Sequence, residues 1–121
     1  MRTDKILITG AGGQLGTVLT KQLQKKHGFD NVIASDLRIN SSFEGCFEVL
    51  DVTNFDALKN CVLKNEITQI YHLVAILSAK GEEAPLKTWD INMGCLFNVL
   101  EVSRLCKIDK IFYPSSIAVF G

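Results

Sequence analysis

A glycine-rich segment near the N-terminus has the residue types and spacing of an anion-binding turn. Residues 9–16 read Thr-Gly-Ala-Gly-Gly-Gln-Leu-Gly, between the apolar run 6–8 and an amphipathic helical pattern. Glycines let a backbone approach a phosphate closely, and the free N–H groups and positive dipole end at a helix start attract an anion. The segment predicts a nucleotide pyrophosphate site, although a glycine triplet can also form a plain strand-to-helix turn.

The spacing of the glycines narrows the class of turn. Gly10, Gly13 and Gly16 follow a G-x-x-G-x-x-G pattern, whereas the tighter G-x-G-x-x-G fails because Leu15 occupies its last position. We expect Gln14 and Leu15 to contact the cofactor together with these three glycines.

An acidic residue stands where a dinucleotide site would need one. Asp36 follows the apolar run 32–35, twenty residues beyond Gly16. At that distance a carboxylate can accept hydrogen bonds from the adenosine ribose hydroxyls, and it repels a 2′-phosphate. Arg38, two residues later, could instead hold a 2′-phosphate, and an aspartate in a surface turn is the structural alternative. We favour NAD over NADP and place Leu37 and Arg38 beside the adenosine.

A second carboxylate follows the next apolar run. Asp51 and Val52 come directly after residues 47–50, and Asp51 could meet the adenine amino group. As a bare pair these residues fit a turn or a helix cap equally well.

Five short apolar runs alternate with longer helical patterns, which is typical of a parallel α/β sheet. Right-handed crossovers predict a doubly wound Rossmann sheet with the strand order 3-2-1-4-5. Ligands bind such sheets at the C-terminal edge, where the winding reverses between strands one and four. The expected strands are residues 5–9, 32–35, 47–50, 69–74 and 110–113.

The helical patterns between these strands have recognisable faces and ends. Asn54 is a good N-cap, and Pro85 stands where a helix start tolerates proline, before a long buried helix up to about Cys106. Residues 39–46 are short and rich in Ser, Asn and Gly, so we expect a loop there. The first helix is expected to bury Leu15, Val18, Leu19 and Leu23.

Composition and length limit the classes of function. With 121 residues and 47% hydrophobic content, the chain can bury one core of ordinary size, so we expect a single domain over residues 1–121. Thirteen basic residues balance thirteen acidic ones without a basic run, which argues against a nucleic-acid partner. The four cysteines form no C-x-x-C pair, so we expect reduced thiols and no metal site.

The apolar runs are also too short to span a membrane as helices. None approaches the ~20 residues of a membrane-spanning helix. The first residues lead straight into the first expected strand, without a signal-peptide pattern. We therefore expect a soluble protein of the cytoplasm, or of the mitochondrial matrix if a transit peptide has been removed.

These motifs together resemble the N-terminal half of the extended short-chain dehydrogenase/reductase family, which contains nucleotide-sugar epimerases and dehydratases. The resemblance runs through all 121 residues and rests on residues 9–16, 34–38, 51–52, 72–75, Asn92 with 99–101, and 114–121. Within that superfamily the chain is more similar to the short-chain type of L-threonine 3-dehydrogenase than to a sugar epimerase. This similarity rests on residues 32–38, 77–79, 89–93 and 114–121.

The resemblance also implies roles for particular residues. Leu73 and Ala75 would line the nicotinamide ribose, Asn92 would support the cofactor edge of strand four, and Ser78 could meet the substrate amine or carboxylate. Ser116 would orient the substrate hydroxyl, with Ser115 as its rival. The alternatives are that the two serines only end a strand and that Ser78 is a loop hydroxyl. His72 fits a packed core histidine better than a base.

The family's proton acceptor is missing from the sequence. It is a tyrosine with a lysine four residues later, and neither Tyr71 nor Tyr113 stands in such a pattern. A phenol near its reference pKa of ~10 is a poor base at neutral pH. We therefore expect an incomplete domain that lacks the later strands and the substrate lobe and is inactive by itself.

The resemblance leaves three functions open. The complete protein would oxidise L-threonine with NAD to 2-amino-3-oxobutanoate, as a homodimer. The alternatives are a nucleotide-sugar 4-epimerase or dehydratase of the same superfamily, and a truncated protein that binds NAD without turnover.

Overall fold

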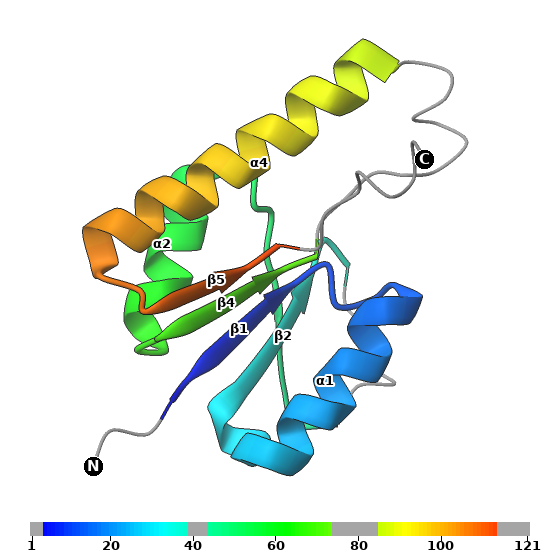
Figure 1. Cartoon of the computed structure of the whole chain (residues 1–121), viewed down its shortest axis with the longest axis vertical. Helices are drawn as coiled ribbons and strands as arrows, with labels where there is room; N and C mark the ends of the chain where they lie inside the picture. The colour runs from blue at the N-terminus through cyan, green and yellow to red at the C-terminus, as the bar shows by residue number, and fades with distance from the viewer. Residues whose placement is uncertain (1–3, 39–43, 74–84, 114–121) are drawn as a thin grey trace.

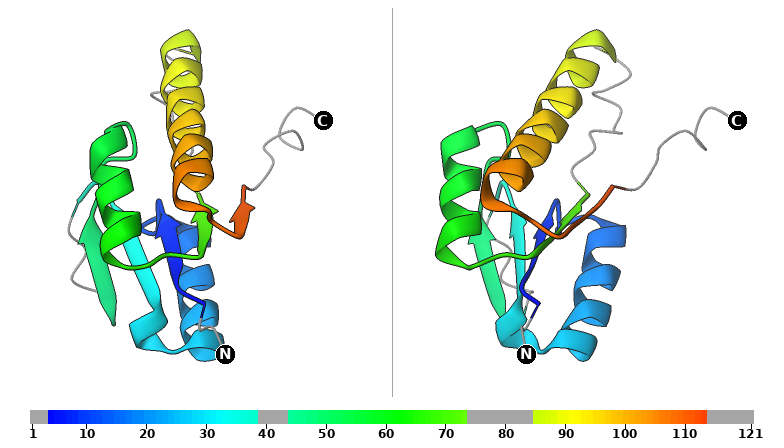
Figure 2. Two further views of the ribbon diagram at one scale, coloured as in Figure 1. Left: turned by 90° about the vertical axis from the view of Figure 1, so that its left-hand side faces the viewer. Right: turned by 60° about the vertical axis from the view of Figure 1, so that its left-hand side comes forward.

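The computed structural model describes residues 4–38, 44–73 and 85–113, with the side chains of Gln14 and of residues 85–89 left out. The described elements form a sheet of five parallel strands between two layers of helices (Figure 1). Helix α1 covers one face, and helices α2 and α4 cover the other (Figure 2). In chain order the elements are β1 (Ile6–Thr9), α1 (Gln14–His27), the 3-10 helix η1 (Phe29–Asn31), β2 (Val32–Asp36), β3 (Cys46–Val49), α2 (Phe55–Lys64), β4 (Gln69–His72), α4 (Pro85–Cys106) and β5 (Lys110–Phe112).

The strand order is β3-β2-β1-β4-β5, which confirms the predicted Rossmann order. The central strand β1 pairs in parallel with β2 on one side and with β4 on the other, so that Ile6 lies opposite both Val32 and Gln69. The winding of the sheet therefore reverses between β1 and β4. The glycine-rich turn follows β1 and so lies at the C-terminal edge of the sheet, beside this reversal.

The strand ends agree with the sequence to within one residue, apart from the end of the fourth strand. That strand ends at His72, and Val74 lies outside the described residues. Of the expected loop at 39–46, residues 39–43 lie outside them as well, and Cys46 opens β3.

Apolar side chains pack on both faces of the sheet, as a buried parallel sheet requires. The core beneath α1 is the smaller of two clusters, and its buried members are Ile6, Ile8, Ala11, Leu23, Val32 and Ala34. The core beneath α2 and α4 includes Leu7, Ile33, Leu58, Val62, Ile70, Cys95, Val99 and Val102.

The buried face of α1 differs from the predicted one. Leu15 is 58% exposed and Val18 is 59% exposed, so the expectation that both pack inward is wrong. The cause is Gly16, where an added Cβ would lie 2.7 Å from backbone atoms of Gly10 and Ala11. This close contact turns the Gly16 side of the helix toward the sheet, and it turns Leu15 and Val18 toward solvent. Among the described side chains and glycines of α1, Gly16, Thr20, Leu23 and Gln24 are buried, and Leu19 is partly buried against the core.

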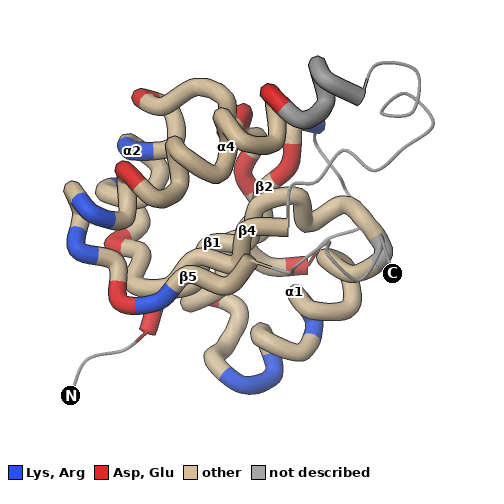
Figure 3. Tube along the Cα trace, turned by 45° about the horizontal axis from the view of Figure 1, so that its top comes forward, with Lys and Arg blue, Asp and Glu red and all other residues tan. Residues whose placement is uncertain are grey.

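The helix ends follow their predicted signals. The Asn54 side chain caps α2 by accepting a hydrogen bond from the Ala57 N–H at 3.1 Å, and α4 begins at Pro85. Basic residues occupy the last turn of α1, where they complement the negative end of the helix dipole (Figure 3). Among the described residues no helix combines the length and the apolar character that crossing a membrane requires.

Candidate functional site

The glycine-rich turn joins β1 to α1, and its three glycines serve different purposes. Gly10 has a φ of 69°, a conformation that glycine adopts without strain. Gly13 is the N-cap of α1 and offers no side-chain cap, and the first turn of the helix holds no acidic residue. Among the described residues, a Cβ at Gly13 would meet only the Gly10 carbonyl oxygen, at 3.9 Å, so the described part of the chain leaves space beside this backbone. Gly16 packs the helix against the turn.

The start of α1 therefore offers backbone donors to an approaching group. The first N–H groups of any helix have no partner within the helix, and the helix dipole makes this end positive. The Ala11 N–H donates a hydrogen bond to the Ser35 backbone carbonyl at 2.9 Å, and this bond fixes the turn to the end of β2. Such a helix start is a common binding site for anions, because its backbone N–H groups and its dipole both favour negative charge.

Asp36 ends β2 and contacts the same turn. One of its carboxylate oxygens accepts a hydrogen bond from the Gly12 N–H at 2.8 Å, and the other accepts one from the Leu37 N–H at 2.7 Å. The carboxylate thus lies beside the glycine-rich turn, at the sheet edge where a ribose could reach it.

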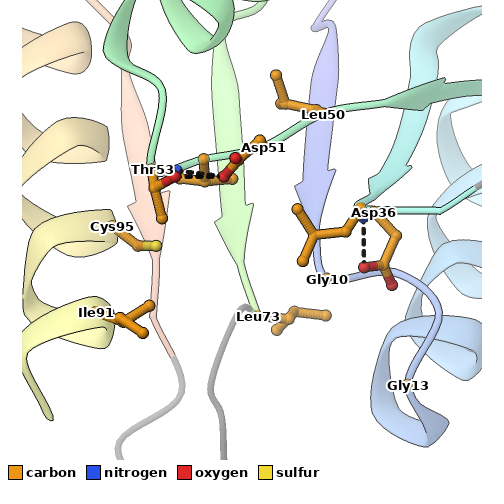
Figure 4. Close-up of a pocket in the computed structure, with 11 residues that line it drawn as sticks. Gly10, Gly13, Asp36, Leu50, Asp51, Thr53, Leu73, Ile91 and Cys95 are labelled. Carbon is orange, nitrogen blue, oxygen red and sulfur yellow. Dashed lines mark hydrogen bonds between the residues drawn. The ribbon is translucent and has the colours of Figure 1, made fainter. Parts of the chain in front are cut away.

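A cavity of about 300 Å³ lies at this edge and joins five separate parts of the chain (Figure 4). The turn, the end of β2, the segment after β3, the residue after β4 and one face of α4 all contribute. Its lining residues are Gly10, Gly13, Asp36, Leu37, Leu50, Asp51, Val52, Thr53, Leu73, Ile91 and Cys95.

Several lining residues were missed by the sequence reasoning. Ile91 and Cys95 stand four residues apart on one face of α4, within the predicted long helix, and no role at the site was predicted for either. Leu50 and Thr53 flank the Asp51-Val52 pair, so a wider window around that pair would have included them.

Other predicted residues lie elsewhere or outside the described part of the chain. Leu15 and Arg38 are exposed and do not line the cavity, and Asn92 lies on α4 without lining it. Gly16 is buried against the turn. The residues outside the description are the side chain of Gln14 together with Ala75, Ser78, Ser115 and Ser116.

Asp51 has a fixed orientation in the loop after β3. Its Oδ1 atom accepts hydrogen bonds from the Thr53 N–H at 2.9 Å and from the Thr53 hydroxyl at 2.6 Å (Figure 4). Both bonds fall on one oxygen, and no hydrogen bond to Oδ2 is found from the described residues. Asp51 can therefore present a carboxylate acceptor to a ligand in the cavity.

The sequence model of the NAD dependent epimerase/dehydratase family matches residues 6–121. The chain belongs to this family. NAD is the cofactor of the family, and the residues at the sheet edge fit it. The uncapped start of α1 suits a pyrophosphate, the open space at Gly13 allows its approach, and Asp36 adds an acceptor for hydroxyl groups.

Known proteins support the same assignment. An uncharacterized epimerase/dehydratase of Staphylococcus haemolyticus is 43% identical over 98% of this chain and 38% of its own length. The chain thus spans about two fifths of the length of the curated relatives that it matches.

Solved structures of longer proteins share the fold of this family member. A partial consensus L-threonine 3-dehydrogenase has a TM-score of 0.90 and 48% identity over 97% of this chain and 38% of that one. The L-threonine dehydrogenase of Clostridium difficile has a TM-score of 0.89 and 42% identity over 100% of this chain and 39% of that one. A UDP-glucose 4-epimerase of Thermus thermophilus in complex with NAD has a TM-score of 0.74 at 20% identity, over 88% and 36% of the two chains, which shows a shared fold.

His72 closes β4 beneath α4 in this member of the epimerase/dehydratase family. It is fully buried, as predicted for a packed histidine, and its Nδ1 lies 2.8 Å from the Thr9 hydroxyl. That hydroxyl also accepts a hydrogen bond from the Leu73 N–H at 3.2 Å, which ties it to the residue after β4. The ring stacks on Tyr113 at 5.5 Å, and Nε2 has no partner among the described residues. Burial lowers the pKa of His72 to about 4, so the imidazole is neutral at physiological pH.

The buried imidazole predicts a loss of stability on acidification. An unfolded histidine binds a proton near pH 6.5, whereas folded His72 resists it until about pH 4. The contribution of neutral His72 to the free energy of unfolding is fully present above pH 6.5. Between pH 6.5 and pH 4 it falls by up to about 1.4 kcal/mol per pH unit. Urea unfolding at about pH 7.5 and about pH 5 should show a larger loss for the native chain than for His72→Gln. Equal losses in both proteins would contradict the buried neutral state.

The described tyrosine in the sheet is not poised as a base. Tyr71 stacks on Phe112 at 4.3 Å, and burial raises its pKa above the ordinary value. A phenol with a raised pKa holds its proton at neutral pH. Among the described residues, therefore, neither Tyr71 nor His72 offers a general base at the sheet edge.

Proposed function

We propose that the chain is the NAD-binding portion of an L-threonine 3-dehydrogenase, which converts L-threonine and NAD into 2-amino-3-oxobutanoate and NADH. The assignment of threonine as the substrate rests on the similarity to solved L-threonine dehydrogenase structures, at 42% to 48% identity over nearly all of this chain. The whole of residues 1–121 would form the cofactor-binding part of the longer protein.

The cavity supports a division of roles for holding the cofactor. Gly10, Gly13 and the start of α1 would hold the pyrophosphate, because they offer backbone donors without side chains in the way. Asp36 would accept hydrogen bonds from the adenosine ribose, and Asp51 would accept one from the adenine amino group. Leu73, which lines the cavity after β4, would lie toward the nicotinamide ribose.

Catalysis requires further groups. When bound, NAD supplies the carbon that accepts hydride from the alcohol. Ser116, with Ser115 as its rival, remains the predicted hydroxyl that orients the alcohol, and Ser78 remains the predicted contact for the amine or carboxylate. Since neither Tyr71 nor Tyr113 belongs to a Tyr-x-x-x-Lys pattern, we assign turnover to the longer protein.

Titration calorimetry of the chain with NAD and with NADP tests the cofactor assignment. We expect NAD to bind at least about 10-fold more tightly, because the 2′-phosphate of NADP would meet the Asp36 carboxylate. ADP-ribose should retain most of the affinity of NAD, since it keeps the adenosine, the pyrophosphate and the second ribose, which are the groups assigned to the cavity residues. Equal or tighter binding of NADP would contradict the role of Asp36.

A sugar-nucleotide epimerase is the second candidate, favoured by the family and by the shared fold of the UDP-glucose 4-epimerase. The longer protein distinguishes the two candidates. Formation of NADH that depends on L-threonine would support the dehydrogenase, whereas interconversion of UDP-glucose and UDP-galactose would support the epimerase. Binding of NAD with neither reaction would identify a protein that holds the cofactor without turnover.

A further inference from the structure

We infer that Asn98 of α4 is a positioning residue for the adenine end of the cofactor site, an inference that rests on the proposed NAD function. Its side-chain amide donates hydrogen bonds to the Val52 carbonyl at 2.8 Å and to the Thr53 carbonyl at 3.1 Å. One NH₂ group thus holds two consecutive backbone carbonyls of the loop after β3. Asn98 lies 45 residues beyond Thr53 in the sequence, so the contact joins distant parts of the chain.

The fastened loop is the one that carries Asp51. Val52 and Thr53 follow Asp51 directly, and both line the cavity. The Thr53 N–H and hydroxyl together hold Oδ1 of Asp51, so the position of Thr53 decides where Oδ2 points. Asn98 therefore acts on the carboxylate through Thr53, without reaching the cavity itself.

The face of α4 supports this role. Ile91, Cys95 and Asn98 follow one another at spacings of four and three residues, which places them on one side of a helix. The first two line the cavity, and the third holds the loop at its rim. The same helix face thus forms the wall of the adenine end and fixes the loop that closes it.

The chemistry of the contact makes an isosteric test possible. Both partners of Asn98 are carbonyl oxygens, which only accept hydrogen bonds, so the side chain must donate. Asn98→Asp keeps the shape but places a carboxylate against two carbonyls, and the loop is then repelled. Asn98→Ala removes the donor, and water can then reach the Thr53 carbonyl, since that contact is exposed, whereas the contact to Val52 is partly buried.

The experiment compares NAD with nicotinamide hypoxanthine dinucleotide, which carries a carbonyl oxygen in place of the adenine amino group. The native chain should prefer NAD by about 10-fold, because Asp51 accepts from the amino group and repels the carbonyl. In Asn98→Asp and Asn98→Ala this preference should fall below about 3-fold, together with a loss of about 10-fold in NAD affinity. The discrimination ratio is the readout that a general loss of stability would not change.

Val99→Ala is the matched control. Val99 is a fully buried neighbour on α4 that packs in the core and does not line the cavity, so its truncation lowers the urea midpoint and leaves the discrimination ratio unchanged. An unchanged ratio in both Asn98 variants would overturn the inference while leaving the NAD assignment intact. A native chain that binds neither dinucleotide would overturn the proposed cofactor site and this inference with it.

Discussion

Replacing Gly16 by alanine is expected to lower the free energy of unfolding by about 3 kcal/mol, the largest effect on stability that we predict. The new Cβ would lie 2.7 Å from the Ala11 Cα and from the carbonyl oxygens of Gly10 and Ala11. All three atoms belong to the backbone, so no side chain can rotate away. Either α1 moves off the sheet or the turn after β1 deforms. Urea unfolding followed by circular dichroism measures the change.

Two other glycines provide matched controls for the same substitution. Gly94 is exposed on α4 and a Cβ there would meet none of the described atoms within 4 Å, so Gly94→Ala should raise stability by about 0.5–1 kcal/mol. Gly13→Ala should lower stability by at most about 1 kcal/mol, because alanine is a poorer N-cap than glycine, and should weaken NAD binding, because its Cβ would fill the space through which the pyrophosphate approaches. Similar urea midpoints for the Gly16 and Gly94 variants would show that the close packing at Gly16 is not important for the fold.

The largest effect on ligand affinity is expected at Asp36. Asp36→Ala should weaken NAD binding by about 10-fold to 100-fold, the cost of losing hydrogen bonds to a charged acceptor. It removes the proposed acceptor for the ribose hydroxyls and also the partners of the Gly12 and Leu37 N–H groups. Titration calorimetry against NAD measures the loss.

Arg38→Ala is the control at the same end of the site. Arg38 is exposed and does not line the cavity, so its removal should change NAD affinity by less than about 3-fold. Asp36→Asn separates the two roles of the carboxylate, since an amide oxygen can still accept from Gly12 but no longer repels a 2′-phosphate. It should therefore narrow the gap between NAD and NADP. Native affinity in Asp36→Ala would refute the assignment.

The strand order could be predicted because buried parallel strands leave short, almost wholly apolar runs in the sequence. The turn at Gly10 and the carboxylate at Asp36 could be placed from the same pattern, since parallel strands end at one edge of the sheet. The predicted face of α1 was wrong because counting apolar residues ignored Gly16. A glycine has no hydrophobicity to count, and its packing against Ala11 becomes visible only in three dimensions.

The remaining part of the site depends on contacts between distant segments. Ile91 and Cys95 read as ordinary core residues of a helix, and nothing local indicates that a cavity lies beside them. Asn98 reads as a polar residue on a helix surface, where water is its expected partner. Only the packing of α4 beside the loop after β3 brings its amide to Val52 and Thr53.

The central position of β1 has a consequence for the order in which the chain can fold during synthesis. The bond between the Ser35 hydroxyl and the Ile8 carbonyl joins β2 to β1 across 27 residues, whereas the contact between Thr9 and His72 spans 63. A growing chain can therefore form β1, α1 and β2 while the other edge of β1 still has no partner. That edge stays open to pairing with foreign strands until β4 has left the ribosome, so the time needed to translate the intervening residues sets the period of risk.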